Sequence, residues 1–291
     1  MPIRLDSPYR DADIPWLRGN LHTHTTNSDG PYSPQDTVDA YAALGYDFLM
    51  ISDHDQLTEP ASLDNRSMTL IPGNEISANG PHLLHVGADR VLEPDADRQR
   101  VIDAIGCDGH FAILNHPNWE KSFNHCPQEC LDRWQGYAGI EIYNGIIRNL
   151  EGSPFATDRW DRLLAQGRRV WGYATDDCHR PGDLAVAWTM VQAPRSVAGI
   201  VTALREGRCY CSTGVTIARI AVDGLTVRIE TANAHRIIAY GDYAYRIAHE
   251  DGPAMTFTVP EDIAKRYVRF ECWGAGEAIA WTQPFFIERA D

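Results

Sequence analysis

Two histidines one residue apart, followed by an acidic residue where a strand should end, constrain this sequence more than any other feature. His22 and His24 lie in a segment with extended-strand character, and residues two apart on a strand point to the same face. Asp29 and Gly30 follow at the expected turn. Two imidazoles on one face, with a carboxylate just beyond the strand tip, are difficult to explain as packing. They indicate one half of a metal site.

The composition sets limits on the partners of such a site. With 291 residues, 44% of them hydrophobic and 23% charged, the chain can form a large α/β domain and a smaller one. Its formal net charge of −14 argues against a long nucleic acid as partner, although divalent ions would admit a small anionic substrate. The N-terminus has no signal-peptide pattern, no apolar run could span a bilayer, and the seven cysteines are scattered. We expect a cytoplasmic protein with reduced thiols and no membrane partner, and its oligomeric state stays open.

Strands and helices alternate up to residue 212. The apolar runs predict strands at 17–24, 48–52, 69–76, 82–86, 111–114, 140–144 and 170–174, and helices at 34–44, 97–105 and 159–166. Short loops between them indicate parallel βα units. The fold class predicted for 17–212 is therefore α/β, an irregular barrel, with the chemistry at the carboxyl ends of the strands. Residues 1–16 are expected to form an irregular lead-in.

The pattern changes after residue 212. Short β-rich runs separated by turn signals predict a small antiparallel sheet or sandwich over 213–291, without a convincing helix. Such an appended region could cap the substrate or bind a sugar. A role in packing or dimerisation is favoured, because a fold alone says nothing about a site.

Histidine, aspartate and glutamate recur at the ends of the successive predicted strands. These residues are His22, His24, His54, Glu75, His82, His85, His116, Asp177 and His179. This is the ligand set of zinc, manganese or iron, and it is too large for one tetrahedral ion, so two or three divalent ions are expected. Histidines outside this pattern are interpreted as core or surface residues; they are His110, His125, His235 and His249.

The ordered motifs between residues 18 and 180 resemble the polymerase and histidinol phosphatase (PHP) family of metallohydrolases. They are His22-Thr23-His24, Asp29, Ser52-Asp53-His54, Gly73-Asn74-Glu75, Asn115-His116-Pro117 and Asp177-Cys178-His179. Residues 207–214 and 280–284 resemble the stand-alone branch with a C-terminal β domain, which includes enzymes similar to the carbaryl hydrolases. The resemblance implies a distorted (β/α)7 barrel with up to three metal ions, and it leaves the cleaved bond open.

The resemblance also implies a ligand set. The first ion would be held by His22, His24, Glu75 and Asp177, the second by Glu75, His116 and one histidine of 82–85, and the third by Asp29, His54 and His179. His82 and His85 have opposite parity on a strand, so only one should face the metals. His85 is preferred and His82 is the alternative. Asp53 and Asp176 are expected to support the ligands from behind or to accept hydrogen bonds from backbone amides, and not to bind the ions directly.

The ligand set predicts hydrolysis by a metal-bridging hydroxide, because a water between two ions is acidified towards a pKa of ~7. Glu75, Asp177 and His179 are the predicted catalytic residues. Arg180 and Arg148 are candidates for positioning the substrate, Lys121 is a weaker one, and a solvated surface position is the alternative for each. Three aromatic or polar residues are candidates for the pocket wall, with a position in the core as the alternative for the aromatic ones: Trp119, Tyr143 and Asn144.

Three functions follow from these predictions. The leading one is a metal-dependent phosphoesterase acting on a small phosphomonoester, cyclic phosphate or nucleotide. The second is a hydrolase of carboxylic or carbamate esters or amides that uses the same hydroxide. The third is a non-catalytic metal-binding module, against which the complete ligand set argues. A free-standing exonuclease is disfavoured, because the acidic chain shows no basic groove studded with aromatic residues.

Overall fold

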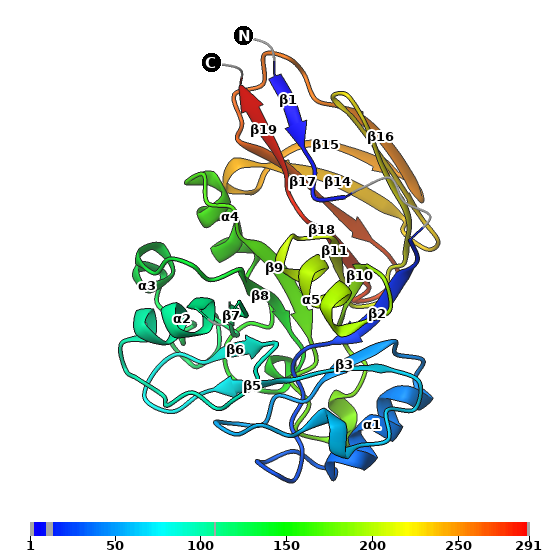
Figure 1. Ribbon diagram of the computed structural model, residues 1–291. Coiled ribbons are helices and arrows are strands. Elements are labelled where there is room, and N and C mark those ends of the chain that lie inside the picture. Colours follow the sequence, from blue (N-terminus) through cyan, green and yellow to red (C-terminus); the bar gives the residue numbers. More distant parts are fainter. Residues whose placement is uncertain (1–2, 10–13, 108, 290–291) are drawn as a thin grey trace.

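The computed structural model describes residues 3–9, 14–107 and 109–289, which form an α/β fold built on three β-sheets (Figure 1). The sheets contain both parallel and antiparallel strand pairs, so the expected α/β class is confirmed. None of the helices in the described ranges has the length and apolar character needed to cross a bilayer.

The largest sheet has 11 strands and joins the two ends of the sequence. Its order is β1-β19-β17-β18-β11-β10-β2-β3-β4, with β14 and β15 branching from β17. The strands are β1 (Ile3–Asp6), β2 (Trp16–Asn20), β3 (Phe48–Met50), β4 (Thr69–Ile71), β10 (Trp188–Gln192), β11 (Cys209–Ser212), β14 (Arg236–Gly241), β15 (Tyr245–Asp251), β17 (Tyr267–Trp273), β18 (Ile279–Thr282) and β19 (Phe285–Arg289). Because β1 pairs with β19 along its length, residues 3–6 of the expected irregular lead-in form a strand of this sheet.

The second sheet has five strands and follows the chain order. They are β5 (Gly73–Ile76), β6 (Leu83–Val86), β7 (Phe111–Leu114), β8 (Gly139–Asn144) and β9 (Trp171–Thr175). The pairs β7–β8 and β8–β9 are parallel, as expected for βα units, but β5–β6 and β6–β7 are antiparallel. The link from β5 to β6 spans only residues 77–82, which is too short for the crossover that parallel neighbours need.

The third sheet is a three-stranded antiparallel one in the order β12-β13-β16. Its strands are β12 (Ile217–Asp223), β13 (Thr226–Thr231) and β16 (Ala254–Thr258). Within the described part of the chain after residue 216, only the short 3-10 turn η4 (Asp242–Ala244) is helical, in agreement with the predicted β-rich character.

The helices flank the sheets (Figure 1), and two of them begin after a capping serine. They are α1 (Pro34–Ala43), α2 (Arg98–Cys107), α3 (Gln128–Arg133), α4 (Thr157–Ala165) and α5 (Val197–Arg205), with the 3-10 turns η1 (Pro60–Ser62), η2 (Ile146–Asn149) and η3 (Pro181–Asp183). Ser33 caps α1 by accepting a hydrogen bond from the Asp36 amide, and Pro34 is the first helical residue. The expected helices are therefore present, while α3 and α5 were not predicted.

A buried ion cluster joins helix α4 to strand β17. The Arg269 guanidinium contacts Asp161 through Nε at 2.8 Å and Nη2 at 2.7 Å, and it donates from Nη1 to Glu271 Oε1 at 2.8 Å. The Tyr267 hydroxyl donates to Asp161 at 2.6 Å. Each charge has a partner, as buried charges require, so this cluster fixes the C-terminal strands against α4.

The polar ends of the strands meet where the two larger sheets come together. Thr23, beyond β2, forms a single parallel bridge with Cys178, beyond β9. His54, beyond β3, forms another with Glu75 of β5. These two bridges bring residues from both sheets to one place, where the candidate site lies.

Candidate metal centre

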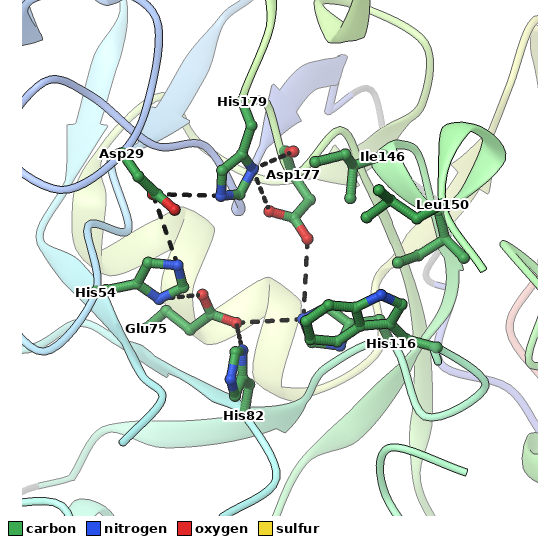
Figure 2. A pocket seen from close by; sticks show the side chains of 11 residues that line it. Asp29, His54, Glu75, His82, His116, Ile146, Leu150, Asp177 and His179 are labelled. Atoms are coloured by element: carbon green, nitrogen blue, oxygen red, sulfur yellow. Dashed lines mark hydrogen bonds and ion pairs between the residues drawn. The ribbon is translucent and has the colours of Figure 1, made fainter. Parts of the chain in front are cut away.

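Most of the predicted ligands line a cavity of about 240 Å³ at the strand ends (Figure 2), although His22 and His24 are not among its lining residues. Its lining residues are Asp29, His54, Glu75, His82, His116, Trp119, Ile146, Ile147, Leu150, Asp177 and His179. Figure 2 shows Ile146 and Leu150 on the side opposite Asp29 and His54. The cavity therefore has one wall of potential metal ligands and one apolar wall.

The first group consists of His22, His24, Glu75 and Asp177. The Nε2 atoms of His22 and His24 are 3.1 Å apart. Each lies 3.2 Å from Asp177 Oδ1, and they lie 3.3 and 3.4 Å from Glu75 Oε2. Two ligands bound tetrahedrally to one zinc ion at ~2.0–2.1 Å are separated by about 3.3 Å. Five of the six separations in this group thus match a single tetrahedral ion.

The second group shares Glu75 with the first. Glu75 Oε1 lies 3.1 Å from His82 Nδ1 and 3.4 Å from His116 Nε2. Nitrogen atoms of His82, His116 and His125 also lie within 4.8 Å of one another. His125 was interpreted as an isolated histidine. Its Nε2 accepts a hydrogen bond from the His82 backbone amide at 3.1 Å, so in this arrangement it supports the segment that carries His82.

The third group gathers around Asp29 at the mouth of the cavity. Asp29 Oδ1 lies 3.3 Å from His179 Nε2, 3.6 Å from His54 Nε2 and 3.7 Å from His24 Nδ1. The ligand-type atoms of all four residues lie within 4.8 Å of one another. His24 therefore faces the first group with one ring nitrogen and the third group with the other.

Two buried carboxylate oxygens in these groups lack a well-aligned hydrogen bond from any described residue. They are Glu75 Oε2 and Asp177 Oδ1, although three imidazole nitrogens lie 2.9–3.4 Å from the former and three lie 3.2 Å from the latter. Buried polar atoms in native proteins are normally satisfied. Their lack of donors and the mixed histidine and carboxylate set both fit divalent metal ions.

The electrostatics show that protons must balance these charges when no ion is bound. Burial alone would raise the pKa of Glu75, but the neighbouring His22 and His82 lower it well below its usual range. Burial would lower the pKa of His179, whereas hydrogen bonds to Asp177 and Asp29 raise it to about 11. The carboxylates are thus ionised at neutral pH and positively charged imidazoles neutralise them.

Backbone conformation aims two of these side chains into the cavity. His116 and Asp177, which follow β7 and β9, have φ angles of 24° and 52°. Non-glycine residues rarely adopt positive φ, and such residues cluster at functional sites. The sharp turn after each strand directs an imidazole and a carboxylate back across the strand ends.

Glu141, which the sequence analysis did not single out, holds the first group from behind. Its Oε1 lies 2.7 Å from His22 Nδ1 and accepts from the Thr175 hydroxyl at 2.6 Å. Its Oε2 accepts from the His116 amide at 2.8 Å and from Asn144 Nδ2 at 2.9 Å. A carboxylate that takes the Nδ1 proton of a histidine leaves Nε2 free to bind a metal. A lone glutamate in the apolar strand 140–144 was the available signal.

Asp53 and Asp176 support loops and do not line the cavity. Asp53 accepts hydrogen bonds from the backbone amide of Thr25 and from three hydroxyls of nearby loops. Asp176 accepts from the backbone amides of residues 185–187 and from Tyr41. Burial raises the pKa of Asp176 to about 6. Both placements agree with the supporting role expected for these carboxylates.

The preference for His85 over His82 is corrected by the strand pairing. Glu75 pairs with Leu84, and Asn74 pairs with His85; residues directly opposite each other in antiparallel strands share a face. His85 therefore lies on the face away from Glu75, where its Nε2 is 2.9 Å from His110 Nδ1. His82 has the parity of Leu84 and lines the cavity.

The two arginines expected to position the substrate do not line the metal-type cavity. Arg148 and Arg180 line a second cavity beside it, together with Tyr143. Trp119 lines the first cavity as expected. Asn144 lies behind the ligands and donates to Asp177 Oδ2 at 3.0 Å. The two arginines and the metal-type residues thus line separate cavities.

Known proteins resemble this chain in structure only. No family model matches the sequence, and no curated protein matches it. A crystal structure of a two-domain protein containing a predicted PHP-like metal-dependent phosphoesterase, from Bacteroides vulgatus, is 19% identical with a TM-score of 0.57. The match covers 96% of this chain and 89% of that one.

Two further solved structures are less similar. A putative metal-dependent phosphoesterase from Bifidobacterium adolescentis has 15% identity and a TM-score of 0.45, over 58% of this chain and 90% of that chain. An amidohydrolase from Chromobacterium violaceum with bound sulfate and no metal has 16% identity and a TM-score of 0.42, over 57% and 88%. These two likenesses are too slight to support an argument. The Bacteroides match extends over nearly all of both chains, and this chain therefore shares the fold of that protein.

Proposed function

We propose that this chain is a multinuclear metal-dependent hydrolase, and that its substrate is a small phosphomonoester, cyclic phosphate or nucleotide. One observation carries the proposal. Five of the six separations among the four ligand atoms of the first group are those of a tetrahedral ion, and two of these atoms are buried oxygens without a well-aligned donor among the described residues. A structural role would have satisfied those oxygens, as in the Arg269 cluster.

Each group of ligands is assigned to one of up to three ions. The first ion is assigned to His22, His24, Glu75 and Asp177, the second to Glu75, His82 and His116, and the third to Asp29, His54 and His179, with His24 Nδ1 near it. Zinc, manganese and iron suit this mixture of imidazole and carboxylate. When bound, such ions would supply Lewis acidity, acidifying a water molecule and offsetting charge on the substrate.

The chain's own residues orient the ligands and the substrate. Glu141 holds His22 at Nδ1, and Asn115 donates to Glu75 Oε1 at 2.6 Å, so each ligand keeps one atom towards the cavity. His179 lies at the cavity wall with its Nε2 next to Asp29, where it would hold the third ion. Trp119 and the apolar wall exclude bulk water from one side.

A specific observation favours hydrolysis of a carboxylic or carbamate ester, or an amide, as the second candidate. No described residue lining the smaller cavity is an arginine or lysine. Phosphoester substrates usually meet a cationic side chain as well as the metals, whereas a neutral ester does not need one. The same ligand groups would serve either reaction.

We also propose a division of the chain into a barrel and a β-rich domain. We assign residues 17–212 to a distorted (β/α)7 barrel that carries the ligands, and residues 213–291 to a β-rich domain. The bridges Thr23–Cys178 and His54–Glu75 support the barrel, since they connect the two larger sheets at the strand ends.

The test compares three substrates with protein loaded with zinc, manganese or iron(II). p-Nitrophenyl phosphate, bis(p-nitrophenyl) phosphate and p-nitrophenyl acetate report on monoester, diester and carbon ester hydrolysis. We expect turnover of a phosphate that chelation abolishes and metal restores. Activity on the acetate alone would refute the phosphoesterase and support the second candidate.

Two histidine variants, one at the first group and one far from it, test whether the activity depends on the site. His22→Ala should lose the activity together with the bound metal measured by elemental analysis. His249→Ala, at an exposed position of β15, should keep both. Equal losses in the two variants would mean that the activity does not depend on the first group.

A further inference from the structure

The smaller cavity opens beside a larger one of about 1090 Å³. Ile147 and Leu150, at the 3-10 turn η2, line both chambers, so a molecule held at the ligand groups can extend past this turn. The smaller chamber, at about 240 Å³, falls below the ~300–1,000 Å³ typical of ligand sites. The larger chamber therefore has room for the rest of a substrate.

The C-terminal strands supply one wall of the larger cavity. Trp273 ends β17, Ile279 begins β18, and Gly276 and Glu277 lie in the turn between them. The opposite wall comes from residues 143–155 and from 180–183. The appended β-rich region thus faces the site, which favours a substrate-contacting role over the packing role expected from the sequence.

Two large aromatic side chains that line this cavity are exposed. Phe155 is 40% exposed and Trp273 is 39% exposed. Phe155 also packs edge-to-face on Tyr143, with ring centroids 5.1 Å apart. Large apolar side chains held at the wall of a cavity indicate a site for an apolar ligand group.

The same cavity holds two arginines that form no ion pair with any residue in the described ranges. Arg148 and Arg180 are exposed, and Arg148 Nε donates only to the Gly145 carbonyl. The nearby Asp183 is buried and already accepts from the His179 amide and from Asn149. In a chain with a net charge of −14, two unpaired guanidiniums at one cavity indicate an anionic ligand group.

We propose that the larger cavity binds the part of the substrate that is not cleaved, and that this part is a planar apolar group bearing an oxyanion such as a carboxylate or phosphate. Trp273 and Phe155 contact the planar group, and Arg148 and Arg180 bind the oxyanion. The proposal rests on the proposed function only for the identity of the bond that is cleaved. It makes the C-terminal strands a determinant of substrate choice.

The test first uses metal-free protein, so that binding is independent of the ligand groups. Biphenyl-4-carboxylate, biphenyl-4-ylphosphonate and the neutral biphenyl-4-carboxamide are titrated by calorimetry. We expect the better of the two anions to bind about tenfold more tightly than the amide, as one charge-assisted contact allows. The two anions distinguish a carboxylate from a phosphate. Equal binding of all three probes would overturn the proposal.

Variants locate the binding. The double change Arg148→Met and Arg180→Met should remove the advantage of the anions, whereas Arg219→Met, at an exposed position of β12, should keep it. Trp273→Ala should weaken all three probes about tenfold, a typical loss for one stacking contact. Tyr245→Ala, which removes another exposed aromatic, should not. Unchanged thermal unfolding shows that each variant is folded, and equal losses in variants and controls would refute the site.

A linked probe then tests whether the two chambers act together. 4′-Carboxybiphenyl-4-ylphosphonate carries one anion for the metal ions and one for the arginines. In metal-loaded protein it should bind more tightly than either singly charged biphenyl, because its second contact is intramolecular. Loss of this gain with intact metal-free binding would disprove continuity between the chambers. Absence of phosphate turnover with intact probe binding would instead refute the proposed function alone.

Discussion

Two clusters of buried charge in this molecule look alike in composition and differ in how they are satisfied. At the Arg269 cluster, Asp161 and Glu271 both meet a guanidinium at hydrogen-bond distance. At the first ligand group, Glu75 and Asp177 each keep one oxygen without a well-aligned donor among the described residues. Burying an unsatisfied charge is costly. The difference indicates that the Arg269 cluster stabilises the fold, whereas the first ligand group binds a ligand.

The largest expected effect, on metal content and activity, comes from removing a charge at the first ligand group. Glu75→Gln keeps the shape of the side chain but removes the carboxylate shared by two ligand groups. Most bound metal should be lost, and activity should fall by more than the roughly 10–100-fold that supporting residues contribute. Elemental analysis and turnover of the active substrate measure this. Glu261→Gln, at an exposed turn, is the control, and full metal retention in Glu75→Gln would refute the ligand assignment.

Removing a charge from the Arg269 cluster should affect stability and not metal. Arg269→Met leaves Asp161 and Glu271 buried without their cation, at a cost of about 3–5 kcal/mol in the free energy of unfolding. Denaturant unfolding measures the loss, and metal content per folded protein should stay the same. If metal were lost while stability held, the contrast between the two clusters would be wrong.

A smaller effect is expected at the carboxylate behind His22. Glu141→Gln can no longer take the Nδ1 proton of His22 as a charged partner, and metal affinity should fall roughly 10–100-fold. Competition with a metal-binding dye gives the affinity. Glu230→Gln, on the three-stranded sheet, should leave the affinity unchanged. An unchanged affinity in Glu141→Gln would mean that His22 needs no support from this side.

The pH dependence of metal binding tests whether the charged imidazoles of the candidate site are metal ligands. With a pKa of about 11 in the absence of ions, His179 is protonated at neutral pH, and an ion that binds it must displace this proton. Metal affinity should therefore rise with pH, by up to about tenfold per unit for each proton released. Calorimetry in two buffers with different ionisation enthalpies counts the protons. Binding without proton release would exclude His179 as a ligand.

The sequence predicted the position of the site better than its support. Parity on a strand and polar residues at strand ends depend only on local geometry, so His22, His24 and Glu75 could be placed together. The choice between His82 and His85 depends on the register of β5 against β6, which a single strand does not reveal.

Contacts between segments that are distant in the sequence could not be predicted either. His125 lies beside His82 only because a loop folds back over β6, and nothing in its own neighbourhood signals this. Likewise, Trp273 reaches the cavity wall through the pairing of β17 with β18. Local patterns predict strands in residues 213–291, but no local pattern predicts that these strands lie beside residues 143–155.

The pairing of β1 with β19 (Figure 1) also constrains the order in which the protein can form during synthesis. On the ribosome, residues 3–6 emerge long before residues 285–289, and until then β1 has no partner strand. The segments that carry the candidate ligands, up to His179, are made earlier and can assemble first. Until β19 has been synthesised, β1 could pair with a wrong strand. Because β1 is short, it offers few backbone groups for such non-native pairing in the nascent chain.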